Sequence, residues 1–190
     1  DSLFLKLGTF LRARRELAAA QAQSLMDPAS GFYTQFGLHQ LTEQLEARAV
    51  RNHEPIACLA FSSQSSGSIA GEEDHGRFAE VLHVVREQAR KSDVVAKTGT
   101  SQLSILAPDT DAAGAQLLVA RLQRELDALS RKTPTLGRFH LRAGYCAVAD
   151  LATANVDLNE LVHRAESALA HVPPSGNSNA VVSFDDLPLA

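Results

Sequence analysis

The chain has 190 residues, of which 45% are hydrophobic and 21% are charged, and this ordinary globular composition excludes wholesale disorder. Its formal net charge of -4 and its pI near 6.0 argue against nucleic acid as the main partner.

The first predicted element is a helix over residues 1–26, which contain few helix breakers. The apolar residues that recur there at roughly heptad spacing are Phe4, Leu7, Leu11, Ala18 and Leu25. This pattern predicts a linker helix that joins an upstream module to the domain and pairs with a second copy of itself. Pro28 and Gly31 break the pattern. We therefore divide the chain into a linker helix over 1–26 and one domain over 27–190.

The domain alternates between helical and strand-like apolar patterns. Stripes at helical spacing lie over residues 38–49, 78–89, 115–126 and 158–169. Strands are predicted at residues 56–63, 94–96, 103–106, 138–149 and 180–184. The small polar residues of 62–76 predict a loop. Asp157, followed three residues later by Glu160, predicts a capping-box-like helix start.

The element order is helix, strand, helix, hairpin, helix, strand, helix, strand. It predicts an α+β fold with a ferredoxin-like β-α-β-β-α-β core, in which helices pack on one face of a mainly antiparallel sheet.

Two further expectations concern redox state and location. Cys58 and Cys146 lie in apolar strand-like runs without metal-ligand spacing, which predicts buried thiols in a reducing compartment. No apolar run reaches the roughly 18–20 residues that span a bilayer, and the N-terminus lacks a signal-peptide layout. The chain begins at Asp1 without a methionine, so we expect a cytoplasmic fragment of a longer protein, which is either free or attached to a membrane protein.

The predicted hairpin, "SDVVAKTGTSQLSILAPDTD", has a crest of Gly99, Thr100, Ser101 and Gln102 that contains no acidic residue. Together with its surroundings, the hairpin resembles that of a GGDEF domain, the module that in its active form joins two GTP molecules into cyclic di-GMP. "DPASGFYTQFGL" is similar to the family's opening D-x-L-T-G-L-x-N-R-R, "LNELVHRAESALA" to its E-L-L-x-R-A-D-x-A-L-Y, and "GNSNAVVSF" to its G-R-N-R-V ending. The resemblance covers about Asp27 to Phe184 and implies the palm-like core of that family.

The same resemblance implies that the catalytic residues are lost. The family signature falls on residues 99–103, and its metal-binding D-x-D-x-F-K falls on residues 62–67, where Ser62 replaces the first acid. The loop that reads guanine is shorter by about four positions, and a phosphate-contacting lysine falls near Pro173. Mg²⁺ prefers carboxylate oxygens, and neutral hydroxyls do not replace them. We therefore expect no enzyme activity, no cofactor and no metal site, and we assign none to the acidic run Glu72–Asp74 with His75.

One family motif is retained. "RKSD", residues 90–93, resembles the R-x-x-D of the family's inhibitory, product-binding site, and Arg121 falls on a further arginine of that site. A guanidinium suits a guanine edge or a phosphate, and a neighbouring carboxylate accepts from guanine N–H groups. The resemblance thus implies a cyclic di-GMP site at Arg90, Asp93 and Arg121. Arg86, one turn earlier, adds positive potential.

The sequence supports three hypotheses. The preferred one is an inactive GGDEF domain that acts as a cyclic di-GMP receptor, binding the ligand in some cases as an intercalated dimer, and relays the signal to an attached module or partner. The alternative is a nucleotide-independent scaffold that dimerises through the linker helix or contacts other proteins. The third, residual GTP binding in the degenerate cleft, is disfavoured by the shortened loop and the missing acids.

Overall fold

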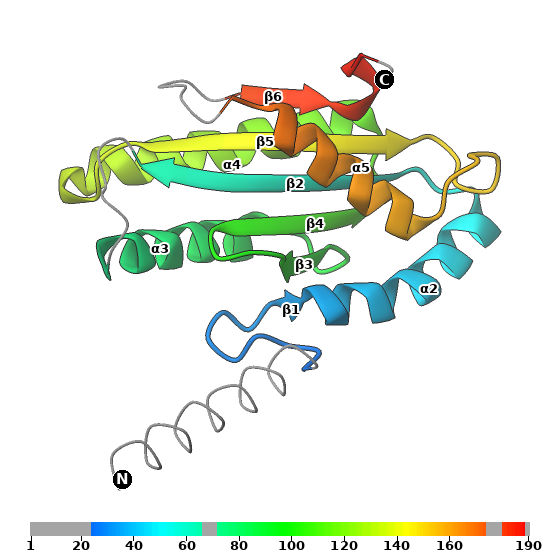
Figure 1. The fold of residues 1–190 in the computed structure, drawn as a ribbon, viewed down its shortest axis with the longest axis horizontal. Helices are drawn as coiled ribbons and strands as arrows, with labels where there is room; N and C mark the ends of the chain where they lie inside the picture. Colours follow the sequence, from blue (N-terminus) through cyan, green and yellow to red (C-terminus); the bar gives the residue numbers. More distant parts are fainter. Residues whose placement is uncertain (1–23, 66–71, 174–179, 189–190) are drawn as a thin grey trace, which may run out of the picture.

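A six-stranded sheet covered by helices on both faces forms the domain (Figure 1). The structure, a computed structural model, describes residues 24–65, 72–173 and 180–188. Of the linker helix expected over residues 1–26, residues 1–23 therefore lie outside the described residues. The elements are β1 (Tyr33–Thr34), α2 (Gln35–Asn52), β2 (Ile56–Ser65), α3 (Glu72–Gln88), β3 (Val94–Lys97), β4 (Gln102–Pro108), α4 (Ala112–Lys132), η1 (Pro134–Leu136), β5 (Phe139–Val148), α5 (Leu158–His171), β6 (Ala180–Ser183) and η2 (Phe184–Asp186).

The strand order is β1-β3-β4-β2-β5-β6, and β2 lies in the middle between two antiparallel partners. The predicted core is confirmed as β2-α3-β3-β4-α4-β5. Parallel pairing adds one strand at each edge, because β1 pairs with β3 and β6 pairs with β5. The α+β class and the mainly antiparallel sheet are therefore as predicted.

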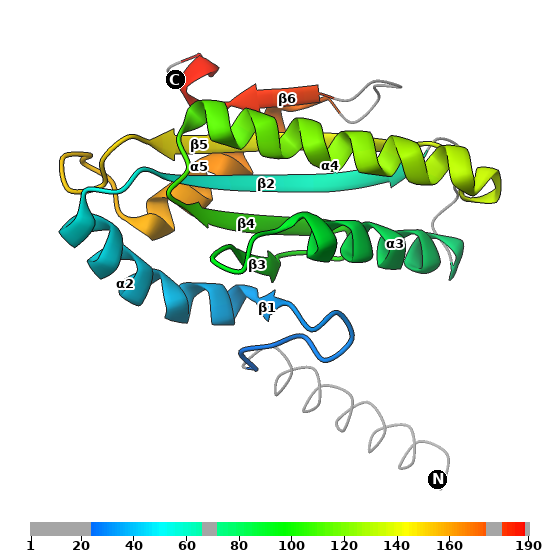
Figure 2. The same cartoon turned by 180° about the vertical axis from the view of Figure 1, so that it is seen from behind.

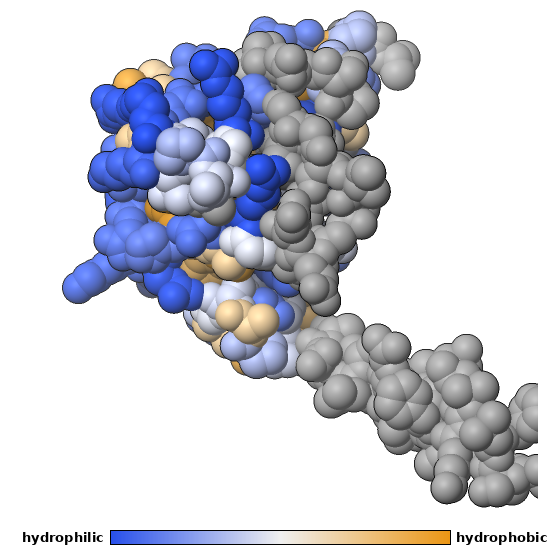
Figure 3. Space-filling model, turned by 90° about the vertical axis from the view of Figure 1, so that its left-hand side faces the viewer, coloured by the Kyte–Doolittle hydropathy of each residue, from blue (hydrophilic) through white to orange (hydrophobic). Residues whose placement is uncertain are grey.

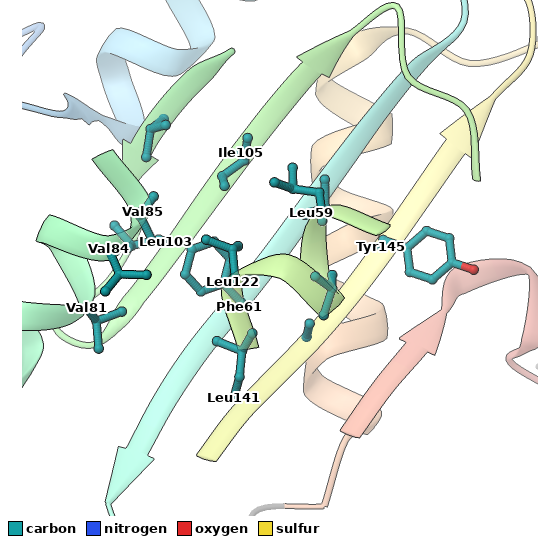
Figure 4. Packing of buried hydrophobic residues seen from close by; sticks show 14 of the residues in the cluster. Leu59, Phe61, Val81, Val84, Val85, Leu103, Ile105, Leu122, Leu141 and Tyr145 are labelled. Carbon is teal, nitrogen blue, oxygen red and sulfur yellow. The ribbon is translucent and has the colours of Figure 1, made fainter. Parts of the chain in front are cut away.

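Helices cover both faces of the sheet, so the expectation of a single helical face is wrong. The helices α3 and α4 pack on the face that holds Leu59, Phe61 and Tyr145 (Figures 2 and 4). On the other face, α2 and α5 enclose a second apolar cluster around Ile56. The stripe of α5 needs its own buried surface, and α3 and α4 already occupy the first face.

Close packing of α5 on the sheet depends on Gly144 in β5. A Cβ atom at this position would lie 2.1 Å from the backbone nitrogen of Leu169 and 2.5 Å from the carbonyl oxygen of Ala165. Only a residue without a side chain permits this approach.

The helix starts follow local capping chemistry. The side chains of Thr34, Asp111 and Asp157 accept hydrogen bonds from backbone N–H groups at the starts of α2, α4 and α5, at 3.0, 2.8 and 2.7 Å respectively. The predicted start at Asp157 is confirmed. Glu160, however, accepts from Arg164 at 2.7 Å.

The loop predicted over residues 62–76 is wrong at both ends, and its middle, residues 66–71, lies outside the described residues. Strand β2 continues to Ser65 because each residue from Ser62 to Ser65 pairs with β5, and α3 already begins at Glu72. Ladder pairing to an adjacent strand outweighs the weak strand propensity of serine. The acidic run 72–74 therefore belongs to the first helical turn.

Ser24–Met26 is not helical, so the helix predicted over residues 1–26 does not reach Met26. The backbone N–H of Thr34 donates to the Leu25 carbonyl at 3.0 Å, and Met26 forms an isolated bridge with Tyr33. Gly37 packs against the backbone carbonyl of Leu25, since a Cβ atom at position 37 would be 2.1 Å from the Leu25 oxygen. The chain that enters the domain is thus held against the start of α2.

Both cysteines are buried free thiols, as predicted, and they face each other as partners in the β2–β5 ladder. Burial raises the pKa of Cys146 to about 11 and that of Cys58 still further. Over the described part of the chain, no helix combines the length and the hydrophobicity that crossing a membrane requires.

Candidate functional site

Backbone hydrogen bonds close the hairpin crest between β3 and β4 into a tight turn. The backbone N–H groups of Thr98 and Gly99 both donate to the carbonyl of Gln102, at 3.1 and 3.3 Å. The side chains available at this crest are a threonine, a serine and a glutamine amide, which are neutral. The crest therefore offers no anionic oxygen to a divalent ion.

The position expected for the first metal-binding acid lies at the same end of the sheet. Ser62 is the ladder partner of Gln102 in β4 and of Arg142 in β5. Its hydroxyl is buried and has no hydrogen-bond partner. Directly opposed strand residues project from the same face, so Ser62 and Arg142 are side-chain neighbours.

Arg142, the ladder partner of Ser62, therefore carries its positive charge on the same face of the sheet as Ser62. Its Nη2 donates to the carbonyls of Leu169, at 3.4 Å, and Val172 at the end of α5. Sequence analysis did not identify this residue, although an arginine inside the apolar run of β5 was a visible signal. Among the described residues, no group of three or more His, Cys, Asp or Glu side chains is placed to hold a metal.

The RxxD motif forms the turn between α3 and β3. The carboxylate of Asp93 accepts from the backbone N–H of Arg90 at 2.7 Å, and the N–H of Asp93 donates to the Arg90 carbonyl at 3.0 Å. The side chain of Arg90 is exposed. Within the described residues it forms no ion pair with Asp93, so the carboxylate binds the backbone and leaves the guanidinium available.

Arg121 reaches the same turn from α4. Its Nη2 donates to the carbonyl of Gln88, the last residue of α3, at 2.7 Å. Its Nε is buried without a partner. The structure therefore brings the three predicted site residues, Arg90, Asp93 and Arg121, to one place.

The electrostatics of Asp93 reflect this arrangement. Burial raises the pKa of Asp93, and this effect exceeds the opposing influence of the Arg90 N–H, the Arg90 charge, the Ser92 hydroxyl and the Arg121 charge. A half-buried carboxylate between two guanidinium groups is suited to a ligand that presents both N–H donors and phosphate oxygens.

Arg86 does not face this site, contrary to the sequence-based expectation. Its Nη2 donates to the carbonyl of Ser30, and its guanidinium lies 5.3 Å from the ring centroid of Phe32. Residues 27–32, which form the junction between the linker and the domain, are thereby attached to α3 one helical turn before Arg90. The interaction joins residues 56 positions apart, so local sequence gave no signal of it.

Asp27 connects the same junction to strand β3. Its carboxylate accepts from the Ser30 N–H at 2.9 Å and lies 3.8 Å from Nζ of Lys97, at the end of β3. Burial raises the pKa of Asp27, but the Ser30 hydrogen bonds and the Lys97 charge outweigh it and leave the pKa below its ordinary value. The junction is therefore connected to both α3 and the hairpin.

The six-stranded sheet flanked by helices defines a palm-like α+β domain, and comparison with known families specifies its family. A family model described as diguanylate cyclase, GGDEF domain, matches residues 24–179. The chain therefore belongs to the GGDEF domain family. Comparison with curated proteins finds no match.

Solved structures share the fold. The GGDEF domain of DgcB from Caulobacter crescentus, in complex with c-di-GMP, has a TM-score of 0.71 and 14% identity, over 85% of this chain and 96% of that one. The FimX GGDEF domain from Pseudomonas aeruginosa has a TM-score of 0.65 and 20% identity, over 83% and 99% of the two chains. A microbial GGDEF domain described for a novel interaction mode with cyclic di-GMP has a TM-score of 0.63 and 17% identity, over 86% and 99%.

Proposed function

We propose that this GGDEF domain is a catalytically inactive receptor for cyclic di-GMP, which binds at Arg90, Asp93 and Arg121. The observation that carries the proposal is the convergence of these residues from the α3–β3 turn and α4, with the Arg90 side chain exposed and a buried Arg121 Nε unpaired. The ligand also accompanies related structures, the DgcB domain among them.

Each group has a distinct role in binding. The Arg90 guanidinium donates to guanine O6 and N7 or to a phosphate oxygen, in the bidentate geometry that arginine favours. The Asp93 carboxylate, held by the Arg90 N–H, accepts from the guanine N1 and N2 hydrogens. Arg121 adds a second positive charge from α4. The receptor would act in the cytoplasm, alone or within a membrane-attached protein.

The inactivity rests on the chemistry of the crest. Joining two GTP molecules requires a divalent ion to gather phosphate charge and to activate the attacking hydroxyl. Ser62 and Ser101 supply neutral oxygens, and Arg142, the ladder partner of Ser62, supplies a cation on the same face of the sheet. A guanidinium in this position repels the metal that the reaction needs.

A nucleotide-independent scaffold is the second candidate, and one observation favours it. Leu25, Met26 and Phe36 are 51%, 41% and 42% exposed, and they lie where the linker joins the domain. An apolar patch at this junction suits a protein contact or a second copy of the chain. On this reading, binding of cyclic di-GMP would be absent.

Calorimetric titration with cyclic di-GMP separates the two candidates. The matched variants are Arg90→Ala and Arg124→Ala, since Arg124 is exposed on α4 and contributes to no described site contact. Arg90→Ala retains the backbone N–H that holds Asp93, so the turn should survive the substitution. We expect a loss of affinity of about tenfold or more for Arg90→Ala and little change for Arg124→Ala.

Equal affinities for the two variants, or no binding by the wild type, would favour the scaffold. Incubation with GTP and Mg²⁺ followed by chromatography tests inactivity independently, and formation of cyclic di-GMP above background would contradict it.

A further inference from the structure

A cationic cavity lies at the opposite end of α3 from the RxxD turn. Its volume is about 530 Å³, and it opens between the end of α4, η1 and the start of β5. The end of the molecule that carries this part of α4 is strongly hydrophilic where its surface is described (Figure 3). The lining residues that matter here are Asp127, Ser130, Arg131, Gly137, Arg138 and Phe139.

Three arginines approach this cavity from three elements. Arg131 and Arg138 line it directly and are exposed. Arg77, near the start of α3, places its guanidinium against the backbone of Gly137. Within the described part of the chain, none of the three forms an ion pair or a hydrogen bond.

Gly137 is the residue that admits the Arg77 guanidinium. A Cβ atom here would lie 2.6 Å from Arg77 Nη2, and the backbone has φ of 68° and ψ of -168°. Residues with a side chain rarely adopt this conformation. The backbone and the arginine therefore fit together only with glycine at this position.

The charge balance of the cavity favours an anion. Asp127 is the one acid among the lining residues, and no ion pair within 4.0 Å joins it to a described basic residue. Two exposed guanidinium groups line the cavity and a third approaches it at Gly137, against the single lining carboxylate of Asp127. An excess of like charge at one place is stabilised by a bound anion.

We propose that this cavity binds the phosphate groups of a small oligophosphate, with Arg77, Arg131 and Arg138 as its ligands. Guanidinium forks match phosphate oxygens in bidentate geometry. The two aromatic lining residues, Phe139 and His140, are 3% and 8% exposed, so neither presents an open ring face on which a base could stack. The specificity is therefore for phosphate rather than for a nucleobase.

This site is separate from the RxxD turn and independent of the proposed receptor function. Arg77 and Arg90 stand at opposite ends of α3, about 20 Å apart at the helical rise of 1.5 Å per residue. A ligand that contacts Arg77 therefore does not reach Arg90.

Calorimetric titration with inorganic pyrophosphate, in buffer without Mg²⁺, tests the proposal on the full chain. We expect saturable binding that weakens about tenfold in each of Arg131→Ala and Arg138→Ala. Arg124→Ala, an exposed arginine of the same helix outside the cavity, should bind as the wild type does, and so should Arg90→Ala. Amide NMR shifts should change at Arg131 and Gly137 on titration.

Three results would overturn the proposal. The first is the absence of saturable pyrophosphate binding. The second is equal weakening by Arg124→Ala, which would indicate general charge attraction. The third is loss of binding in Arg90→Ala alone, which would locate pyrophosphate at the RxxD turn. Because Arg131 and Arg138 are exposed, their variants should fold, and unchanged melting temperatures would verify this.

Discussion

Arg86 provides a direct test of how the linker junction is attached to the domain. Arg86→Met replaces the arginine with an unbranched apolar side chain. The substitution removes the hydrogen bond to the Ser30 carbonyl and the cation–π contact with Phe32. Ser30 is 4% exposed and Phe32 is 7% exposed, so water cannot readily replace either contact.

The size of the effect follows from these two contacts. A charged hydrogen bond to a buried carbonyl contributes about 1.5 kcal/mol when the donor is partly exposed, and the cation–π contact about 0.5–1 kcal/mol. The free energy of unfolding should therefore fall by about 2 kcal/mol. For a domain of this size, that corresponds to a decrease in melting temperature of about 4–8 °C.

Thermal unfolding followed by circular dichroism measures the effect, with Arg124→Met as the matched control. The control removes an exposed arginine without described contacts and should change stability by less than about 0.5 kcal/mol. Arg86→Lys, which keeps the charge but not the planar fork, should lie between the two. If Arg86→Met melts together with the control, the junction is not held by this arginine.

Three further predictions concern the site and the core. Asp93→Asn keeps an oxygen for the Arg90 N–H and removes a carboxyl whose pKa is raised by burial, so it should raise the free energy of unfolding at pH 7 more than at pH 3. The sign follows because the Asp93 carboxyl, whose pKa is raised in the folded state, contributes stability to the wild type below the unfolded-state pKa. The wild type loses this contribution as the pH rises through the folded-state pKa. Urea titrations that give the same difference between variant and wild type at both pH values would contradict the prediction. Ser62→Asp should leave cyclase activity undetectable in a GTP assay, because the new carboxylate would lie beside Arg142 and pair with it. Gly144→Ala should destabilise the domain by about 3 kcal/mol, because its Cβ would overlap the backbone of α5, and wild-type melting of this variant would refute the packing.

Local periodicity in the sequence was sufficient to predict much of the fold. The stripe of α4 from Ala115 to Leu126 is buried as its spacing predicts, and the Asp157 cap is formed as predicted. Such features depend on residues three or four positions apart, so the sequence itself contains the relevant geometry. The serines at positions 62 and 101 are likewise read from the sequence alone.

Tertiary structure decided the features that join distant segments. The ladder that extends β2 to Ser65, the approach of Arg121 to Gln88, and the position of Arg142 beside Ser62 all depend on strand register or helix packing. The second helical face arose for the same reason, because α5 packs where α3 and α4 do not. No local pattern specifies these contacts, since each forms only when the whole sheet brings its two partners together.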